Sequence, residues 1–72
     1  MNRKIRFFKT YWNGMYLTAM IIPSMGGYSL DVKYEDMEGR LHPHFSHGYK
    51  DERGAVRALS TRFRGAEWKE NE

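Results

Sequence analysis

The stretch that most clearly determines the fold is YSLDVKYED at residues 28–36. Every second residue from Tyr28 to Tyr34 is apolar, and the residues between them are polar. This period of two is typical of a strand that buries one face. We therefore expect a strand here, with its apolar side chains in the core and its polar face toward solvent or a partner.

A hairpin is predicted before this strand, because Asn13-Gly14 stands between two aromatic and apolar runs. Both residues tolerate positive φ, which a type I′ turn requires. The first run, residues 3–12, is expected to form a strand that turns Ile5 and Phe7 toward the core and its basic residues away from it. The second run, residues 15–22, is apolar on both faces, as in a central strand.

Proline and methionine residues add detail to this reading. Pro23 is expected to end the second strand, since proline cannot donate to a sheet ladder. Met15 and Met20 are assigned to the core. Met25 and Met37 fall in turns, where exposure would point to an adaptable recognition surface.

A fourth strand and one helix are predicted in the second half of the chain. Residues 40–47 form a plausible strand with Leu41 and Phe45 inward, and Pro43 favours an edge position. The helix is predicted over residues 52–63, with Asp51 as its N-cap and Gly65 as its stop. Its apolar residues recur at helical spacing and are Ala55, Val56, Leu59 and Phe63.

The predicted order is therefore β-β-β-β-α. The fold class is α+β, with an antiparallel meander of three to four strands and one C-terminal helix packed on one face. Residues 1–65 are expected to form one domain, and residues 66–72 a short acidic tail.

Composition excludes several classes of function. The chain has 72 residues and no cysteine, so disulfides and thiolate chemistry are absent. It has no apolar stretch of about 20 residues and no signal-peptide pattern, so we expect a cytoplasmic protein. No phosphate-binding loop, dinucleotide fingerprint or nucleophile elbow is present. We expect no enzymatic activity, no catalytic residue and no cofactor.

The histidines lie close together in the sequence at His42, His44 and His47. A metal site would need a further ligand such as Asp36, Glu38 or Asp51, and nothing in the spacing requires one. We therefore predict no metal site, and we expect the histidines to be surface groups on a sheet edge.

Charge is arranged in blocks, within a net charge of +3. Residues 31–38 carry four acids, whereas residues 50–64 carry five basic groups and two acids. On a helix, Arg53, Arg57 and Arg64 share one stripe opposite the apolar face. Two basic elements in so small a domain favour a nucleic-acid-binding module of a phage or mobile element, although a solvated helix face has the same pattern.

In this first hypothesis DNA is favoured over RNA as the partner. The residues expected to contact it are Arg3, Lys4, Arg6, Lys33, Arg40, His42, Arg53, Arg57 and Arg64.

Residues 27–59 carry a further signal: Gly-Tyr-x-Leu-x-Val-x-Tyr-x-Asp-x-x-Gly-Arg, then Gly48-Tyr49, then Ala55-x-x-Ala58-Leu59. This pattern resembles the arm-type DNA-binding domain of tyrosine integrases, in which a three-stranded sheet lies in the DNA major groove. The resemblance implies structural roles for Tyr28, Val32 and Tyr34. It also implies that Lys33, Arg40, His42 and His44 face DNA.

The second hypothesis is a protein-binding inhibitor of phage type. Small phage inhibitors, including anti-CRISPR proteins, are similar in size and in their sheet–helix layout. Such a protein would bind a host nucleic-acid-processing protein and block its nucleic-acid site. The expected interface residues are Trp12, Asp31, Glu35, Asp36, Glu38, Tyr49, Arg62 and Trp68. A homodimer joined at sheet edges is compatible with either hypothesis.

Overall fold

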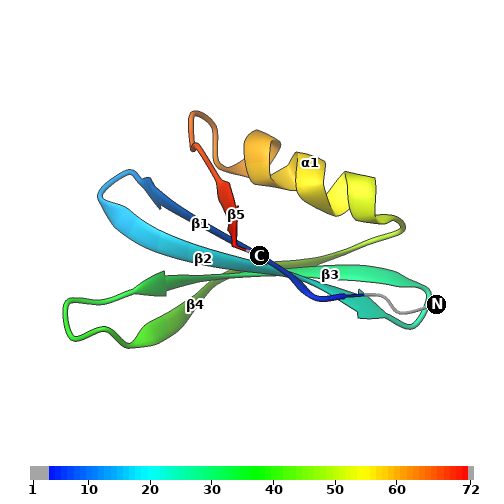
Figure 1. The fold of residues 1–72 in the computed structure, drawn as a ribbon, viewed down its shortest axis with the longest axis horizontal. Coiled ribbons are helices and arrows are strands. Elements are labelled where there is room, and N and C mark those ends of the chain that lie inside the picture. The colour runs from blue at the N-terminus through cyan, green and yellow to red at the C-terminus, as the bar shows by residue number, and fades with distance from the viewer. Residues whose placement is uncertain (1–3, 72) are drawn as a thin grey trace.

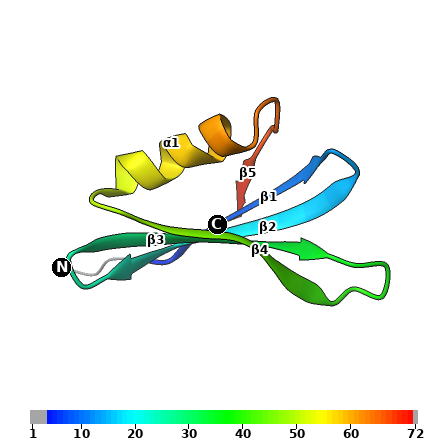
Figure 2. The ribbon, with the colours of Figure 1, turned by 180° about the vertical axis from the view of Figure 1, so that it is seen from behind.

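The computed structural model describes residues 4–71 and contains one five-stranded sheet and one helix (Figure 1). The elements are β1 (Arg6–Trp12), β2 (Met15–Ser24), β3 (Gly27–Glu35), β4 (Leu41–Tyr49), α1 (Glu52–Arg62) and β5 (Lys69–Asn71). All strand pairs are antiparallel, and the sheet order is β4-β3-β2-β1-β5. The α+β meander with one helix on one face is therefore confirmed, and both views show the helix covering a single side (Figures 1 and 2).

The β1–β2 turn is the predicted two-residue hairpin. Asn13 has φ of 52° and Gly14 has φ of 78°, as a type I′ turn requires. This turn sets Trp12 opposite Met15, and every later pair in the hairpin follows from that register.

The helix of the described chain is too short and too polar to cross a membrane.

The core lies between α1 and the sheet face that the helix covers. Its ten buried apolar residues are Phe8, Leu17, Ala19, Ile21, Leu30, Val32, Ala55, Ala58, Leu59 and Phe63. The alternation predicted for residues 28–34 is confirmed, since Leu30 and Val32 are fully buried while Tyr28 and Tyr34 pack against the core.

The prediction that Ile5 and Phe7 point into the core was wrong. Ile5 is 46% exposed and Phe7 39%, whereas Phe8 is buried. The hairpin register explains the difference, because Phe8 pairs with the buried Ala19 while Phe7 pairs with Met20 on the opposite face. Met20 is therefore also not a core residue.

The fourth strand differs from its prediction at one residue. Leu41 is 51% exposed because it pairs with Glu35 on the face away from the helix, whereas Phe45 packs against the core as expected. The β-bulge opposite Val32 and Lys33 adds one residue to β4 between Leu41 and Phe45. The side chains of Leu41 and Phe45 therefore point to opposite faces of the sheet.

The two prolines occupy positions where a missing N–H is tolerated. Pro43 lies in the edge strand β4, next to its bulge, as predicted. Pro23 does not end β2, which continues to Ser24 and pairs Pro23 with Tyr28. The described β1–β2 pairing stops at Ile21, so Pro23 has no strand on the β1 side to which a hydrogen bond would be donated.

The segment predicted as a short acidic tail contributes a fifth strand. Residues 69–71 form β5, which pairs with β1 at the edge of the sheet. The Arg6 guanidinium donates two hydrogen bonds of 2.7 Å to the Glu70 carboxylate, and Thr10 Oγ1 donates to the carbonyl of Glu67. The domain therefore extends beyond residue 65.

Phe63 is where the end of the helix meets the rest of the molecule. Its ring makes edge-on contacts with Trp12, Phe45 and Trp68, at centroid distances of 5.3, 6.0 and 5.6 Å. The last turn of a helix leaves backbone carbonyls without partners inside the helix. The indole N–H groups of Trp12 and Trp68 donate to two carbonyls at this end of the chain segment. Trp68 Nε1 donates to the carbonyl of Leu59, and Trp12 Nε1 donates to that of Arg64.

We expect Phe63→Ala to destabilise the fold by about 3–5 kcal/mol, because it leaves a cavity among three aromatic rings. Phe63→Leu, which keeps much of the volume, is expected to cost less and to remain folded. Urea unfolding followed by circular dichroism measures both. Equal costs for the two variants would contradict this assignment.

We also expect Gly27→Ala to destabilise the fold by about 1–3 kcal/mol, because the new Cβ would collide with the Tyr49 carbonyl oxygen. Gly48→Ala is the matched control, since the nearest atom to its Cβ, the Tyr28 oxygen, lies 3.9 Å away. Thermal unfolding of the two variants tests the difference. A Gly48→Ala variant as unstable as Gly27→Ala would refute the steric explanation.

Candidate nucleic-acid interface

The helix is fixed at its start by Asp51. The Asp51 carboxylate accepts a hydrogen bond of 2.7 Å from the Gly54 amide, and Glu52 adds a negative charge in the first turn. Ala55, Ala58 and Leu59 are buried against the sheet. The helical period then leaves the residues on the opposite side of α1 exposed.

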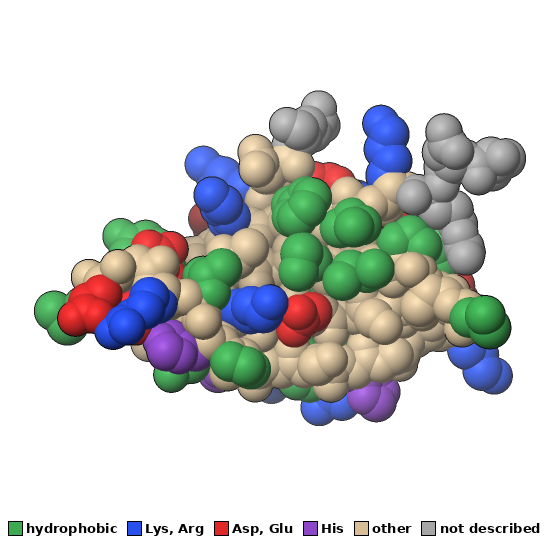
Figure 3. Space-filling model, turned by 90° about the horizontal axis from the view of Figure 1, so that it is seen from below, with side chains coloured by type: hydrophobic (Ala, Val, Ile, Leu, Met, Phe, Trp, Pro, Cys, Tyr) green, Lys and Arg blue, Asp and Glu red, His purple; other side chains and the backbone are tan. Residues whose placement is uncertain are grey.

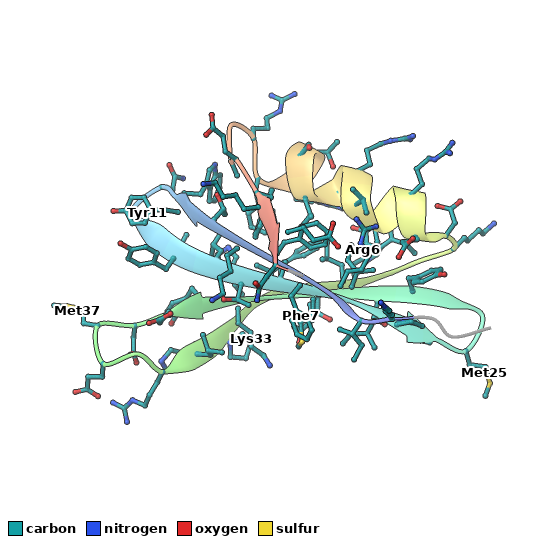
Figure 4. All side chains as sticks on the ribbon, in the orientation of Figure 1. Arg6, Phe7, Tyr11, Met25, Lys33 and Met37 are labelled. Atoms are coloured by element: carbon teal, nitrogen blue, oxygen red, sulfur yellow. The ribbon has the colours of Figure 1, made fainter. Side chains whose placement is uncertain are left out.

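Basic residues lie on this exposed side and next to the helix ends, and together we call them the helix stripe: Lys50, Arg53, Arg57 and Arg64. All four residues are exposed; Arg53 and Arg57 are four residues apart on one side of α1, whereas Lys50 and Arg64 lie just beyond its two ends. Figure 4 shows long nitrogen-tipped side chains extending from α1 away from the sheet.

None of the helix-stripe cations forms an ion pair with another residue in the range 4–71. The two acids at the start of the helix are already engaged. Asp51 caps the helix, and Glu52 lies 3.6 Å from Arg6. The positive charge of the helix stripe is therefore not neutralised within the described structure.

Arg6 has a structural role that its sequence position did not indicate. It was expected to point away from the core face, but it lies on the helix side, where it contacts Glu70 and Glu52. The hydrogen bonds that Arg6 donates to the Glu70 carboxylate raise the pKa of Arg6 and lower the pKa of Glu70. Arg6 thus joins β1, β5 and the start of α1.

The other predicted DNA contacts lie on different surfaces. Lys33 is on the sheet face away from the helix, 3.6 Å from Asp31. Arg40 lies in the β3–β4 turn, where it pairs with Asp36 and Glu38. Lys4 is exposed, and Arg3 lies outside the described residues.

The histidines lie on the helix side of the sheet. His42 stacks on the Tyr34 ring at 5.1 Å, and His44 meets the same ring edge-on at 6.2 Å. They therefore do not share a face with Lys33. The four positions that the integrase resemblance assigns to DNA are not brought onto one surface.

The aromatic residues proposed as protein-binding anchors contribute to packing. Trp12 and Trp68 are partly buried beside Phe63, and Tyr49 packs against the core next to Gly54. Arg62 is exposed with its guanidinium 5.4 Å from the centre of the Phe45 ring.

The proposed acidic interface is divided between two places. Asp31 and Glu35 lie on the sheet face away from the helix, whereas Asp36 and Glu38 lie in or beside the β3–β4 turn. The acids of this hairpin therefore do not form one continuous acidic surface.

Asp36 organises the β3–β4 turn. Its Oδ1 accepts hydrogen bonds of 2.9 Å from the amides of Glu38 and Arg40, and its Oδ2 lies 2.7 Å from His42 Nε2. The contact with His42 and these backbone bonds lower the pKa of Asp36. Within residues 4–71, no group of three or more acidic or histidine side chains is arranged to hold a metal ion.

Sequence reasoning found three of the four helix-stripe residues and missed Lys50. Lys50 precedes the extended N-cap Asp51, so helical spacing does not place it, and only its membership of the basic block at residues 50–64 could have indicated it. Comparison with protein-family models, curated proteins and solved structures gives no match. The functional argument therefore rests on the geometry of the chain itself.

The lowered pKa of Asp36 predicts a pH-dependent contribution to stability. Because the folded-state pKa lies below the unfolded value of about 4, the contribution is present above that pH and is lost as pH falls through the folded-state pKa. We expect Asp36→Asn to be less stable than wild type at neutral pH, with the difference shrinking below about pH 4.

Urea unfolding at a series of pH values measures this difference. Glu38→Gln is the control, since its carboxylate contacts the Arg40 side chain but no turn amide. An Asp36→Asn difference that stays constant with pH would contradict the assignment.

Proposed function

We propose that this protein is a small non-enzymatic nucleic-acid-binding module of the phage or mobile-element type, and that the helix stripe is its phosphate-contacting surface. The observation that carries the proposal is the distribution of ion pairs. Arg6, Lys33 and Arg40 are paired with carboxylates, whereas Lys50, Arg53, Arg57 and Arg64 are exposed together without such partners.

The dimensions of the stripe suit a phosphate backbone. The eleven residues of α1 span about 16 Å at the helical rise of about 1.5 Å per residue, and Lys50 and Arg64 lie beyond the two ends. Phosphates in one strand of duplex DNA follow each other at about 3.4 Å along the axis, so several lie within reach of the stripe. Such contacts give affinity and orientation but no base specificity.

The inhibitor alternative has less support. It needs exposed aromatic anchors and a free acidic surface. Trp12, Tyr49 and Trp68 are engaged in packing, and three of the hairpin acids contact Lys33, Arg40 or His42. We therefore favour nucleic acid, with DNA ahead of RNA, over a host protein as the partner of the helix.

Binding of the protein to labelled duplex and single-stranded DNA and RNA, followed by fluorescence anisotropy over a series of salt concentrations, tests the proposal. Each phosphate contact contributes about 0.9 to the slope of log affinity against log salt. The double variant Arg53→Ala/Arg57→Ala is expected to bind more weakly and to lose nearly two units of slope.

Lys33→Ala is the matched control, because it removes one cation from the opposite face of the sheet. It is expected to leave the slope unchanged. Two results would refute the proposal: no binding by the wild type at low salt, or equal losses for the control and the double variant.

A further inference from the structure

The sheet face away from α1, which we call the open face, carries a row of lysines between exposed aromatic residues. No helix covers this face in either ribbon view (Figures 1 and 2). Figure 3 shows hydrophobic side chains on it, with acidic and basic ones beside them. The strand register places the lysines in the cross-strand row Lys69–Lys9–Thr18–Lys33. The next row toward the β1–β2 turn holds Tyr11 and Tyr16, and the next row in the other direction holds Phe7.

A hollow of about 520 Å³ lies at the end of the open face nearest the β1–β2 turn. Its volume is within the usual range of ligand-binding pockets, about 300–1,000 Å³. Figure 4 places Tyr11 at this end of the sheet, with Phe7 and Lys33 farther along it. The open-face residues that line the hollow include Lys9, Tyr11, Tyr16, Thr18, Glu35 and Lys69.

The two tyrosines of the hollow form an exposed aromatic platform. Tyr11 and Tyr16 are directly opposite in the β1–β2 hairpin, with ring centroids 4.7 Å apart and ring planes inclined at 57°. Tyr11 is 61% exposed and Tyr16 is 63% exposed. Because both rings remain accessible, a flat ligand group has aromatic surface on which to stack.

The two lysines of the hollow place like charges next to each other. Lys9 and Lys69 are directly opposite in the β1–β5 pair, an arrangement that is destabilising for like charges. Neither lysine forms an ion pair within residues 4–71. Lys33, at the other end of the row, lies 3.6 Å from Asp31 and is already paired. An anionic group bound between Lys9 and Lys69 would remove their repulsion.

The acidic residues that line the hollow lie at its margins. Glu70 is held by Arg6 on the helix side of the sheet. The Glu35 carboxylate turns toward the β3–β4 turn, where its Oε2 lies 3.8 Å from the position of a Cβ on Gly39. Glu67 is then the one acid of the lining left beside Lys9 and Lys69, so the β1–β5 side of the hollow keeps a net positive charge.

We infer that the hollow binds single-stranded nucleic acid, with a base stacked on Tyr11 and Tyr16 and the adjoining phosphates at Lys9 and Lys69. The lysines lie two residues along the strand from Tyr11, about 7 Å, so the base and the phosphate of one nucleotide reach both rows. Exposed rings combined with cations are the usual features of a single-strand site.

A single strand suits this hollow better than a duplex does. The bases of a duplex are stacked on one another, whereas the bases of a single strand are free to stack on aromatic side chains. The inference rests on the proposed function for its class of partner, nucleic acid. It uses a separate surface, because the helix stripe lies on the other side of the sheet.

Fluorescence anisotropy with a labelled single strand of about ten nucleotides, and with a duplex of the same length, tests the inference. Tyr11→Ala is expected to weaken single-strand binding about tenfold, because a stacking ring is lost, and to leave duplex binding unchanged. Tyr11→Phe keeps the ring and is expected to bind the single strand as the wild type does. Circular dichroism verifies that both variants are folded.

The salt dependence of single-strand binding tests the lysines. Each phosphate contact with a single strand contributes about 0.7 to the slope of log affinity against log salt. The double variant Lys9→Gln/Lys69→Gln is therefore expected to lose about 1.4 units of slope. Lys33→Gln is the matched control, since it removes a lysine of the same row that is already paired, and it is expected to leave the slope unchanged.

Four results would overturn the inference. These are a wild type that does not bind the single strand, a Tyr11→Ala loss that is absent or equally large for the duplex, equal losses for Tyr11→Ala and Tyr11→Phe, and equally tight binding of a mononucleotide or of an oligoglutamate of matched charge.

The double variant Arg53→Ala/Arg57→Ala separates this inference from the proposed function. It is expected to weaken duplex binding whatever the tyrosine variants do to single-strand binding. Unchanged duplex binding in this variant counts against the helix stripe, whereas unchanged single-strand binding in Tyr11→Ala counts against the hollow.

Discussion

The contact on which the rest of the structure depends is the packing of Phe63. It is the last buried residue of the helical segment, and its ring meets residues from β1, from β4 and from the segment that leads to β5. The helix is only eleven residues long, a length at which an isolated helix is marginal in water. Its order therefore comes from packing on the sheet, from the Asp51 cap at its start, and at its end from Phe63 and the two indoles that donate to the carbonyls of Leu59 and Arg64. The exposed basic stripe keeps its geometry because the opposite side of the same helix is held in this way.

Most of the fold follows from local patterns in the sequence. The alternation at residues 28–34, the Asn13-Gly14 turn and the helical spacing up to Phe63 each determine an element over a few residues. The error at β1 arose because Phe7 and Phe8 are adjacent aromatic residues, so the strand's own pattern does not decide which one is buried. The hairpin register does decide it, since a two-residue turn pairs Phe8 with Ala19.

The remaining errors concern contacts between residues far apart in the sequence. β5 contains only Lys69, Glu70 and Asn71, so no apolar pattern in the sequence predicts a strand there. It is held by Arg6, and the same contact removes Arg6 from the set of free cations. Arg53 and Arg57 were predictable because one helical period fixes both, whereas Lys50 and Arg64 lie outside α1. The pairings of Arg40 and His42 with Asp36 depend on a turn whose conformation the sequence pattern does not specify.

The pairing of β5 with β1 also has a consequence for the order in which the chain folds. The hairpins of β1 to β4 join neighbouring segments, so their contacts close short loops and form early. The Arg6–Glu70 contact spans 64 positions, so it closes a far longer loop than the hairpins do. While a nascent chain still lacks residues 69–71, the outer edge of β1 has no strand beside it. During that interval the unpaired backbone of β1 is open to pairing with another chain, and the late arrival of three polar residues ends the exposure.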